Sequence, residues 1–288
     1  MGMEQDYKAY AQRREDMATT HFGPLWLNQE KRYVHPFRIF GNVWYVGDSW
    51  VCVHLIDTGD GLLLIDTGYP FMRDEIVRNI RSLGFDPADV RGILHSHGHY
   101  DHYGNTLYLK ALSGAETWIS RIDNEIINGR RDLSWAVELG YERLEPFDCD
   151  HLLEDGDVVA LGDVRIRCRL APGHTEGTLA FFFESGGMRL AMHGGVGLNS
   201  MAASFLAARD LPRDLPERFR ESLHALKVEP VDIVLGNHPE QSDTEAKAER
   251  LRAGDLRAFV DPGEWPRFLD ACEARLDEML ARERAERS

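Results

Sequence analysis

The chain has 288 residues, of which 33 are Lys or Arg and 48 are Asp or Glu, so its formal net charge is −15. With 43% hydrophobic and 10% aromatic residues, the composition is typical of a globular protein with a sizeable core and excludes a disordered or fibrous chain. The acidic balance and the lack of a basic cluster argue against nucleic acid and against an anionic membrane surface as partners. We expect a small-molecule substrate.

Cysteine usage and the N-terminal sequence bear on the cell compartment. The cysteines form no CxxC pair and are expected to be reduced thiols, at Cys52, Cys149, Cys168 and Cys272. The first 25 residues contain no apolar segment typical of a secretory signal, and no run of about 18 apolar residues predicts a membrane-spanning helix. We therefore expect a cytoplasmic protein.

The sequence indicates one domain after a polar start. Residues 1–35 are expected to form a polar leader, and residues 36–288 a single domain with a C-terminal helix. No internal repeat, low-complexity segment or Pro- or Ser-rich linker divides this second part. The oligomeric state stays open, because the apolar face of the last helix can pack on its own domain or on a second copy.

Strand patterns dominate the first third of the domain. β-branched and aromatic residues and short apolar runs predict strands over residues 42–47, 50–56, 62–65 and 92–94. Residues 58–61 have the composition of a hairpin turn. From Pro70 to Gly84 the apolar spacing becomes that of a helix, with Gly84 as its stop.

The rest of the chain continues this alternation. Strands are predicted over residues 164–170, 179–183, 189–192 and 231–235. Helices are predicted over residues 215–226 and from about Glu264, with residues 281–288 as a solvated, fraying end. Residues 121–155 and 198–214 are less regular and are predicted to be loops over a site.

A dense group of histidines follows the predicted strand over residues 92–94. The segment reads His-Ser-His-Gly-His-Tyr-Asp-His and contains His95, His97, His99, Asp101 and His102. Three more histidines stand at the ends of later predicted strands, namely His174, His193 and His238. Ends of strands followed by glycine-rich loops are places where a sheet presents ligands. These residues are therefore candidates for one shared site.

The residue types in this group favour zinc. Neutral imidazoles with one carboxylate suit zinc or a similar cation, whereas calcium and magnesium prefer shells of oxygen. Iron, manganese and nickel remain alternatives. No cysteine lies near these positions, which excludes an iron–sulfur cluster or a four-thiolate structural site.

These motifs resemble those of the metallo-β-lactamase superfamily. The family signature H-x-H-x-D-H matches His97, His99, Asp101 and His102 without a gap. Further landmarks follow in the family's order, namely Asp66-Thr67-Gly68, Pro172 to Thr175, and a late strand that ends in His238. The resemblance covers roughly residues 36–240. It implies an α/β fold (an αββα sandwich) of two mixed β-sheets packed face to face, with helices on both outer sides. Periodicity alone indicates only mixed α and β structure.

The resemblance also implies a ligand set for two zinc ions. His97, His99 and His174 would bind the first metal, and Asp101, His102 and His238 the second. Two metals about 3.5–4 Å apart can share a hydroxide, lower its pKa and polarise the bond under attack. Asp101 is the expected catalytic residue, because it would both hold a metal and steer the nucleophile. The chemistry implied is hydrolysis without a covalent intermediate.

One position departs from many hydrolases of the superfamily. Glyoxalase-type thioesterases and lactonases carry a metal-bridging aspartate after the strand that follows Pro-Gly-His, where this chain has Gly195. The zinc β-lactamases with six ligands also lack that aspartate, and the segment Pro36 to Gly47 resembles their first strands. They usually carry serines here that bind the β-lactam carboxylate, and a signal peptide, whereas this chain reads Gly195-Val196-Gly197.

The resemblance leaves several functions open. The leading hypothesis is a dinuclear zinc hydrolase that uses a metal-bound hydroxide on an ester, lactone or amide bond of a small molecule. The first alternative is a zinc β-lactamase, and the second is a metal-binding relative that senses rather than catalyses. The diiron flavoprotein branch is disfavoured because His99 stands where it has glutamate. The nucleic-acid-processing branch is disfavoured because no basic groove is visible.

Other polar residues near the motifs are expected to support the site or the core. Asp66 is expected to hold the metal loop through hydrogen bonds. His95 is expected behind the site at the end of its strand. For His193 a structural role, with a hydrogen bond to a backbone carbonyl, is favoured over a substrate-facing role. Tyr100, Tyr103, Trp118 and Phe205 are expected either to line the pocket or to pack in the core.

Overall fold

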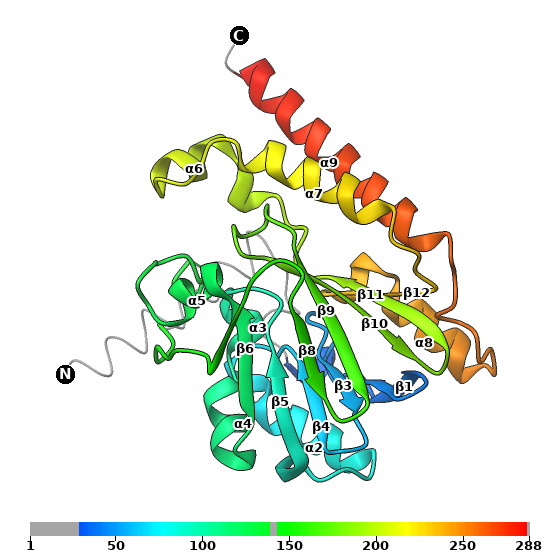
Figure 1. The fold of residues 1–288 in the computed structure, drawn as a ribbon. Coiled ribbons are helices and arrows are strands. Elements are labelled where there is room, and N and C mark those ends of the chain that lie inside the picture. Colours follow the sequence, from blue (N-terminus) through cyan, green and yellow to red (C-terminus); the bar gives the residue numbers. More distant parts are fainter. Residues whose placement is uncertain (1–28, 139–142, 287–288) are drawn as a thin grey trace.

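Two mixed β-sheets pack face to face in the part of the chain that the computed structural model describes, residues 29–138 and 143–286 (Figure 1). Helices cover the outer side of each sheet, so the expected αββα sandwich is confirmed. No helix within these residues is long and apolar enough to cross a membrane.

The first sheet follows the chain order of its seven strands. They are β1 (Phe37–Phe40), β2 (Val43–Tyr45), β3 (His54–Asp57), β4 (Leu62–Ile65), β5 (Val90–Leu94), β6 (Glu116–Ser120) and β7 (His151–Leu153). Strands β1 to β4 are antiparallel neighbours, whereas β4 to β7 run parallel. The parallel half places the carboxyl ends of β4, β5 and β6 at one edge of the sheet.

The second sheet has five strands in the order β12-β11-β10-β9-β8. They are β8 (Val158–Leu161), β9 (Val164–Leu170), β10 (Leu179–Ser185), β11 (Met188–His193) and β12 (Ile233–Leu235). All pairs are antiparallel except β11 and β12, which are parallel. The ends of β11 and β12 therefore also share one edge.

Helices and short turns connect the strands. The α-helices are α2 (Arg73–Ser82), α3 (Tyr100–Tyr103), α4 (Thr106–Ser113), α5 (Arg121–Ile127), α6 (Ala203–Ala208), α7 (Leu215–Lys227), α8 (Thr244–Arg252) and α9 (Glu264–Glu286). Single 3-10 turns are η3 (Gln29–Arg32), η4 (Pro70–Met72), η5 (Pro87–Asp89), η6 (Asn199–Met201) and η7 (Pro239–Gln241). Helices α2 and α4 pack on the seven-stranded sheet, and α7 and α9 on the five-stranded sheet.

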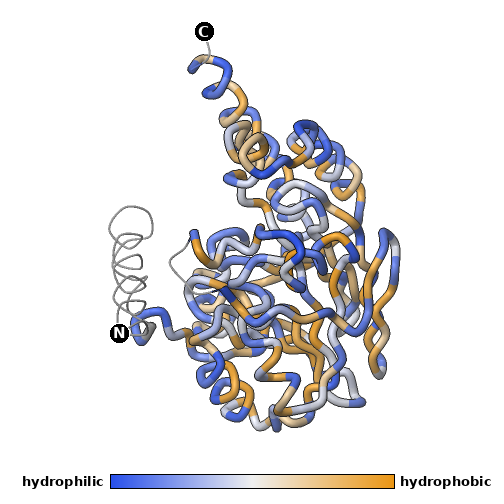
Figure 2. The backbone as a smooth tube through the Cα atoms, turned by 90° about the vertical axis from the view of Figure 1, so that its left-hand side faces the viewer, coloured by the Kyte–Doolittle hydropathy of each residue, from blue (hydrophilic) through white to orange (hydrophobic). Residues whose placement is uncertain are grey.

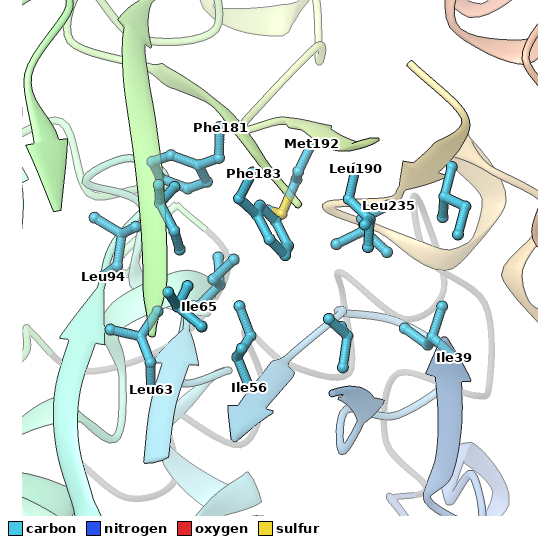
Figure 3. Close-up of a cluster of buried hydrophobic side chains, with 14 of the residues drawn as sticks. Ile39, Ile56, Leu63, Ile65, Leu94, Phe181, Phe183, Leu190, Met192 and Leu235 are labelled. Atoms are coloured by element: carbon cyan, nitrogen blue, oxygen red, sulfur yellow. The ribbon is translucent and has the colours of Figure 1, made fainter. Parts of the chain in front are cut away.

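Alternating side chains build a core on both faces of the central strands. In β4, Leu63 and Ile65 point between the sheets, while Leu62 and Leu64 pack toward α2. Figure 3 shows the layer between the sheets, where Leu63 and Ile65 face Phe181 and Phe183 of β10. Because both faces of these strands are covered, they read as continuous apolar runs in the sequence.

Hydropathy along the backbone follows the same layers. Hydrophobic residues gather where the strands of the two sheets run side by side, whereas the last turns of α9 are hydrophilic (Figure 2). Helix α9 continues to Glu286, so most of the predicted fraying end, residues 281–288, is helical. Residues 287–288 lie outside the described residues.

The predicted strand over residues 50–56 is shorter than expected, because its first half is a loop. The carboxylate of Asp48 accepts hydrogen bonds from the backbone N–H groups of Trp50 and Val51, at 2.8 and 2.9 Å. The N–H of Cys52 donates to the carbonyl of Asn237 at 3.1 Å. With these backbone groups engaged elsewhere, β3 starts only at His54, and Trp50 lies in a loop that lines a pocket.

The predicted leader lies mostly in residues 1–28, outside the described residues. Its last part is not a solvated tail, because Gln29–Arg32 form η3 and the side chain of Arg32 is fully buried. Its guanidinium lies 3.8 Å from a carboxylate oxygen of Asp48 and 4.9 Å from the ring centre of Tyr69. Residues 29–32 therefore pack as part of the domain.

Helices α7 and α9 are joined by one buried indole. Trp265 of α9 is 0% exposed, and its N–H donates to the carbonyl of Leu226 in α7 at 2.9 Å. Its ring meets Phe182 of β10 edge to face. The same side chain thus fixes both helices to the outer face of the five-stranded sheet.

Substitution at Trp265 should separate its packing from its hydrogen bond. We expect Trp265→Ala to lower the free energy of unfolding by about 4 kcal/mol, as large-to-small changes in a core do. Trp265→Phe should cost only about 1 to 2 kcal/mol through the lost hydrogen bond. Urea unfolding measures both, with Leu256→Ala, at 76% exposure, as the control that should change little. Equal losses for the two Trp265 variants would contradict this account.

Candidate metal centre

The candidate residues follow strands that end at neighbouring edges of the two sheets. Asp66 comes directly after β4, and the segment from His95 to His102 directly after β5. From the second sheet, His174 lies in the loop after β9 and His238 in the loop after β12. Residues far apart in the sequence therefore meet because their strands end together.

Three histidines form the first group of possible metal ligands. The ligand atoms of His97, His99 and His174 all lie within 4.8 Å of one another. Their ring centres are 4.4 to 4.7 Å apart, and each pair meets at a steep angle. Such an arrangement points several nitrogen atoms toward one small volume.

The second group contains Asp101, His102 and His238. A carboxylate oxygen of Asp101 lies 3.4 Å from Nε2 of His102 and 3.7 Å from Nε2 of His238. The two histidine Nε2 atoms are 3.3 Å apart. The ring of His102 is 4.3 Å from that of His97, so the two groups adjoin.

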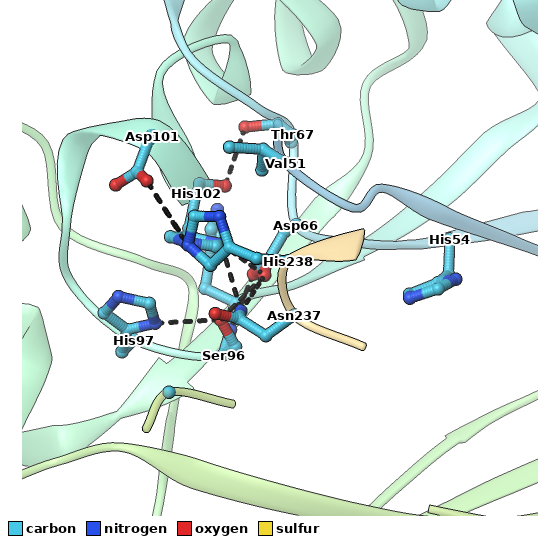
Figure 4. A network of polar contacts seen from close by, with 12 residues as sticks. Val51, His54, Asp66, Thr67, Ser96, His97, Asp101, His102, Asn237 and His238 are labelled. Carbon is cyan, nitrogen blue, oxygen red and sulfur yellow. Dashed lines mark hydrogen bonds and ion pairs between the residues drawn. The ribbon is translucent and has the colours of Figure 1, made fainter. Parts of the chain in front are cut away.

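Hydrogen bonds at the other ring nitrogens orient the buried imidazoles. Nδ1 of His102 lies 2.8 Å from the carboxylate of Asp66, and Nδ1 of His97 lies 3.0 Å from Oγ of Ser96 (Figure 4). The hydroxyl of Ser96 donates to Asp66, so its oxygen accepts from His97. Both rings then carry a proton on Nδ1 and direct their Nε2 atoms into the site.

Backbone carbonyls orient the histidines of the second sheet in the same way. Nδ1 of His174 donates to the carbonyl of Gly197 at 2.9 Å, and Nδ1 of His238 donates to that of Trp50 at 2.6 Å. Nε2 of His97 is buried and has no hydrogen-bond partner. Zinc coordination requires imidazole nitrogens that converge on one point and are held in place by hydrogen bonds at the other ring nitrogen. The donor set has this arrangement and therefore fits zinc.

Asp66 holds the segments of the site together. Its carboxylate accepts from the N–H and the hydroxyl of Ser96 at 2.7 Å each, from His102, and from the side-chain amide of Asn237 at 3.4 Å. Its backbone has a φ of 62°, a conformation that costs energy for a residue with a side chain. The expected supporting role of Asp66 is confirmed by these contacts.

Burial and charge set the protonation of the two groups. Burial lowers the pKa of His97 and of His99 well below the usual range, so both are neutral at pH 7. Burial also opposes the charged form of His102, but Asp101 and Asp66 outweigh it and raise its pKa to about 10. In return, His102 holds the pKa of Asp101 well below its usual range in spite of burial.

Asp123 is a residue of the site that the sequence did not reveal. Its buried carboxylate accepts from the N–H of Gly98 at 2.8 Å, from the hydroxyl of Thr175 at 2.6 Å and from the N–H of Gly177 at 3.0 Å. It therefore ties the loop of His97 and His99 to the loop of His174. Burial raises the pKa of Asp123 to about 6 in spite of these donors.

The structure leaves no room for a side chain at Gly195, the position at which other hydrolases of the resemblance carry the bridging aspartate. A Cβ atom at Gly195 would lie 2.5 Å from Cδ2 of His174, and one at Gly197 would lie 2.8 Å from the same ring. With His174 in this position, neither residue can carry a side chain. The ring of His174 occupies the space in which a carboxylate at Gly195 would begin.

Two further histidines of the sequence analysis lie beside the groups rather than in them. His95 contacts the carbonyl of Trp118 at 3.0 Å and the hydroxyl of Thr106 at 2.7 Å, as a histidine behind the site should. His193 is 1% exposed, and its Nδ1 accepts from the N–H of Gly195 at 3.3 Å. The structural role of His193 fits, but its partner is an N–H rather than the expected carbonyl.

A pocket of about 370 Å³ opens onto both groups. It reaches His174 and His238 and is bordered by three loops and by Arg275 of α9. Its lining residues are Ser49, Trp50, His174, Val196, Gly197, Asn237, His238, Glu240, Gln241 and Arg275. A volume of this size suits a small molecule.

A second, smaller pocket of about 20 Å³ borders His99 and His174. Trp135 and Phe205 cover it, with ring centres 5.1 Å apart and planes only 14° apart. They come from the segments 121–155 and 198–214, which were expected to be loops over the site, although both segments contain regular structure. Phe205 lines this pocket, whereas Tyr100 and Tyr103 are buried in the core and Trp118 packs against it.

Comparison with solved structures identifies relatives across most of the chain. A mutant of the HARLDQ-motif metallo-beta-lactamase from Cronobacter sakazakii is 32% identical, with a TM-score of 0.79, over 88% of this chain and 99% of that one. The family model described as the metallo-beta-lactamase superfamily matches residues 51–190. The chain belongs to the metallo-beta-lactamase superfamily. The resemblance drawn from the sequence motifs is thus confirmed, and the protein is a metal-dependent hydrolase.

Other members of the metallo-beta-lactamase superfamily show where this chain lies within it. A subclass B3 metallo-beta-lactamase of Bradyrhizobium japonicum is 26% identical, with a TM-score of 0.80, over 91% of this chain and 99% of that one. A hydroxyacylglutathione hydrolase of Gloeobacter violaceus is 32% identical over 131 residues, which are 40% of this chain and 44% of that protein. The similarity to the subclass B3 protein therefore extends over most of both chains. The similarity to the hydroxyacylglutathione hydrolase covers less than half of each chain.

Removal of the Asp123 carboxylate should loosen the two loops. Asp123→Ala leaves the N–H groups of Gly98 and Gly177 and the hydroxyl of Thr175 without their acceptor. We expect the unfolding free energy of the metal-free protein to fall by about 3 kcal/mol at pH 7.5. The exposed Asp60→Ala is the control. If Asp123→Ala lowered the unfolding free energy as little as the control does, the carboxylate of Asp123 would not stabilise the two loops.

His193 should make the metal-free protein sensitive to acid. Burial lowers the pKa of His193 from 6.5 to about 3, so between these pH values only the unfolded chain takes up the proton. Unfolding therefore becomes easier as the pH falls, by about 2 kcal/mol at pH 5 for this residue. His193→Gln should reduce the drop in unfolding free energy between pH 7 and pH 5 by this amount. The exposed His35→Gln should leave the drop unchanged, and equal drops in both variants would count against the assignment.

Proposed function

We propose that this chain is a zinc-dependent hydrolase that holds two zinc ions and cleaves an ester, lactone or amide bond of a small molecule. His97, His99 and His174 would bind one ion, and Asp101, His102 and His238 the other. The observation that carries the proposal is the convergence of six donor atoms in two adjoining groups beside one pocket. The cytoplasmic location and the lack of nucleic-acid and membrane partners stay predictions from the sequence.

Different residues of the chain would orient the attacking water and the metal ligands in such a hydrolase. When bound, zinc acidifies water and polarises the bond to be cleaved. Asp101 supplies the one carboxylate of the donor set, in contact with His102 and His238, and is positioned to orient the attacking water. Asp66, Ser96 and two backbone carbonyls keep the imidazoles in one tautomer, so the lone pairs stay directed into the site.

A zinc β-lactamase is a second candidate, which the comparisons favour. The most extended matches are to metallo-beta-lactamases, including one of subclass B3. Against this stands the loop Gly195-Val196-Gly197, which offers no hydroxyl group to the carboxylate of a β-lactam. A relative that binds metal and senses a ligand is the third candidate, and it predicts metal without turnover.

Metal content and ligand substitution test the proposed site. Protein purified without added metal or chelator should contain about two zinc ions per chain, as a dinuclear site requires. His97→Ala and Asp101→Ala should lose metal and activity together, because each removes a donor from one group. The exposed His224→Ala should keep both. Full metal content in either ligand variant would mean that the site is assigned wrongly.

A substrate panel on the same zinc-loaded sample separates the candidate functions. Turnover of acyl thioesters, homoserine lactones or aryl esters that a chelator abolishes would support the proposed hydrolase. Rapid, chelator-sensitive hydrolysis of nitrocefin would favour the β-lactamase. Two bound zinc ions with no turnover of any of these substrates would favour the sensing relative and overturn the proposal.

A further inference from the structure

Arg275 lies on the pocket side of α9 and is not engaged by any acidic partner. Its guanidinium donates to Sγ of Cys272 on the same helix at 3.3 Å. Among the described residues, no carboxylate oxygen lies within ion-pair distance of it. The acidic neighbours Glu273 and Asp277 are engaged by Arg220 of α7, at 2.8 and 2.6 Å.

Arg275 lies at the pocket of the candidate site. It lines the pocket of about 370 Å³ together with His174 and His238, one residue from each ligand group. Gly195 and Gly197 have no room for a side chain here, so the loop after β11 lines the pocket with Val196 and Gly197 and supplies no polar side chain. Helix α9, which is distant in sequence, supplies the pocket's guanidinium instead.

The charge of the pocket favours an anion. Its charged lining residues besides the histidines are Arg275 and Glu240, and these two do not form an ion pair. The proposed ligand set contains one carboxylate for two divalent ions, so the loaded site would itself carry positive charge. In a chain with a net charge of −15, this pocket is a local exception.

We propose that Arg275 is a specificity-determining residue that binds a carboxylate of the substrate. This inference rests on the proposed function, because the bond that is cleaved would lie at the two ligand groups while the carboxylate reaches toward α9. The planar guanidinium can hold a carboxylate with two parallel hydrogen bonds. Ser49 and Gln241 line the same pocket and add a hydroxyl and an amide that can share the anion. The substrate class is therefore a small acyl compound with a free carboxylate.

The first test measures binding without turnover. The zinc-loaded protein is titrated with 3-mercaptopropionate and with its neutral amide, which offer the same thiol to zinc and differ in the carboxylate. We expect Arg275→Gln to raise the Kd of the acid about tenfold and that of the amide less than about twofold. Arg275→Lys should raise the Kd of the acid less than Arg275→Gln does, because lysine keeps the positive charge but cannot form two parallel hydrogen bonds with the carboxylate.

Two matched variants control for charge. Arg282→Gln removes the same charge from the same exposed helix, two turns beyond the pocket, and should leave both Kd values unchanged. Glu240→Gln removes the pocket's acidic group and should not weaken binding of the acid. An equal rise for acid and amide in Arg275→Gln, or the same rise in Arg282→Gln, would overturn the assignment.

A kinetic test separates this inference from the proposed function. The monoester of glutaric acid with 4-nitrophenol is compared with its methyl ester, which lacks the negative charge. Arg275→Gln should raise KM for the acid about tenfold, with kcat little changed, and leave KM for the methyl ester unchanged. Hydrolysis of both esters without this split would overturn the role of Arg275 and leave the hydrolase standing. No hydrolysis of either ester or of any substrate in the panel above, together with the selective loss of thiol-acid binding, would overturn the hydrolase and support the anion site.

Discussion

The carboxylate of Asp66 is the contact on which the site depends. Buried at the end of β4, it collects hydrogen bonds from Ser96 and His102 of the first sheet and from Asn237 of the second. Loops of the two sheets are thereby joined at one point, and the imidazoles of His97 and His102 receive a defined orientation. The positive φ of Asp66 is a local cost that these four hydrogen bonds offset.

Around this point the fold leaves little freedom to the ligand loops. Asp123 joins the loop of His99 to that of His174 from the opposite side, and the carbonyls of Gly197 and Trp50 fix the two histidines of the second sheet. The ring of His174 in turn excludes side chains at Gly195 and Gly197. A rigid donor set is what zinc needs, whereas the substrate contacts come from elements outside it, above all α9.

Local motifs made the donor set predictable, because they carry the resemblance to the superfamily that implies these ligands. The pattern of His97, His99, Asp101 and His102 is local, and regular strands show their burial in the sequence, β4 as a continuous apolar run and β9 as an alternation. Asp123, Trp135 and Arg275 carry no such local signal. Their roles arise from contacts between segments far apart in the chain, and short strands such as β7 lack enough residues to show a period.

From its residues alone, the sequence determined mixed α and β structure, a histidine-rich group at strand ends and the lack of a carboxylate at Gly195, while the αββα fold class and the six candidate ligands followed from the motifs that it shares with the metallo-beta-lactamase superfamily. Only the tertiary structure decided that residues 50–53 leave the strand, because their backbone N–H groups bond to Asp48 and Asn237. It alone placed Asp123 between two ligand loops and Arg275 at the pocket. Hydrogen bonds and charges act over a few ångströms in space, and chain order does not reveal which distant residues come that close.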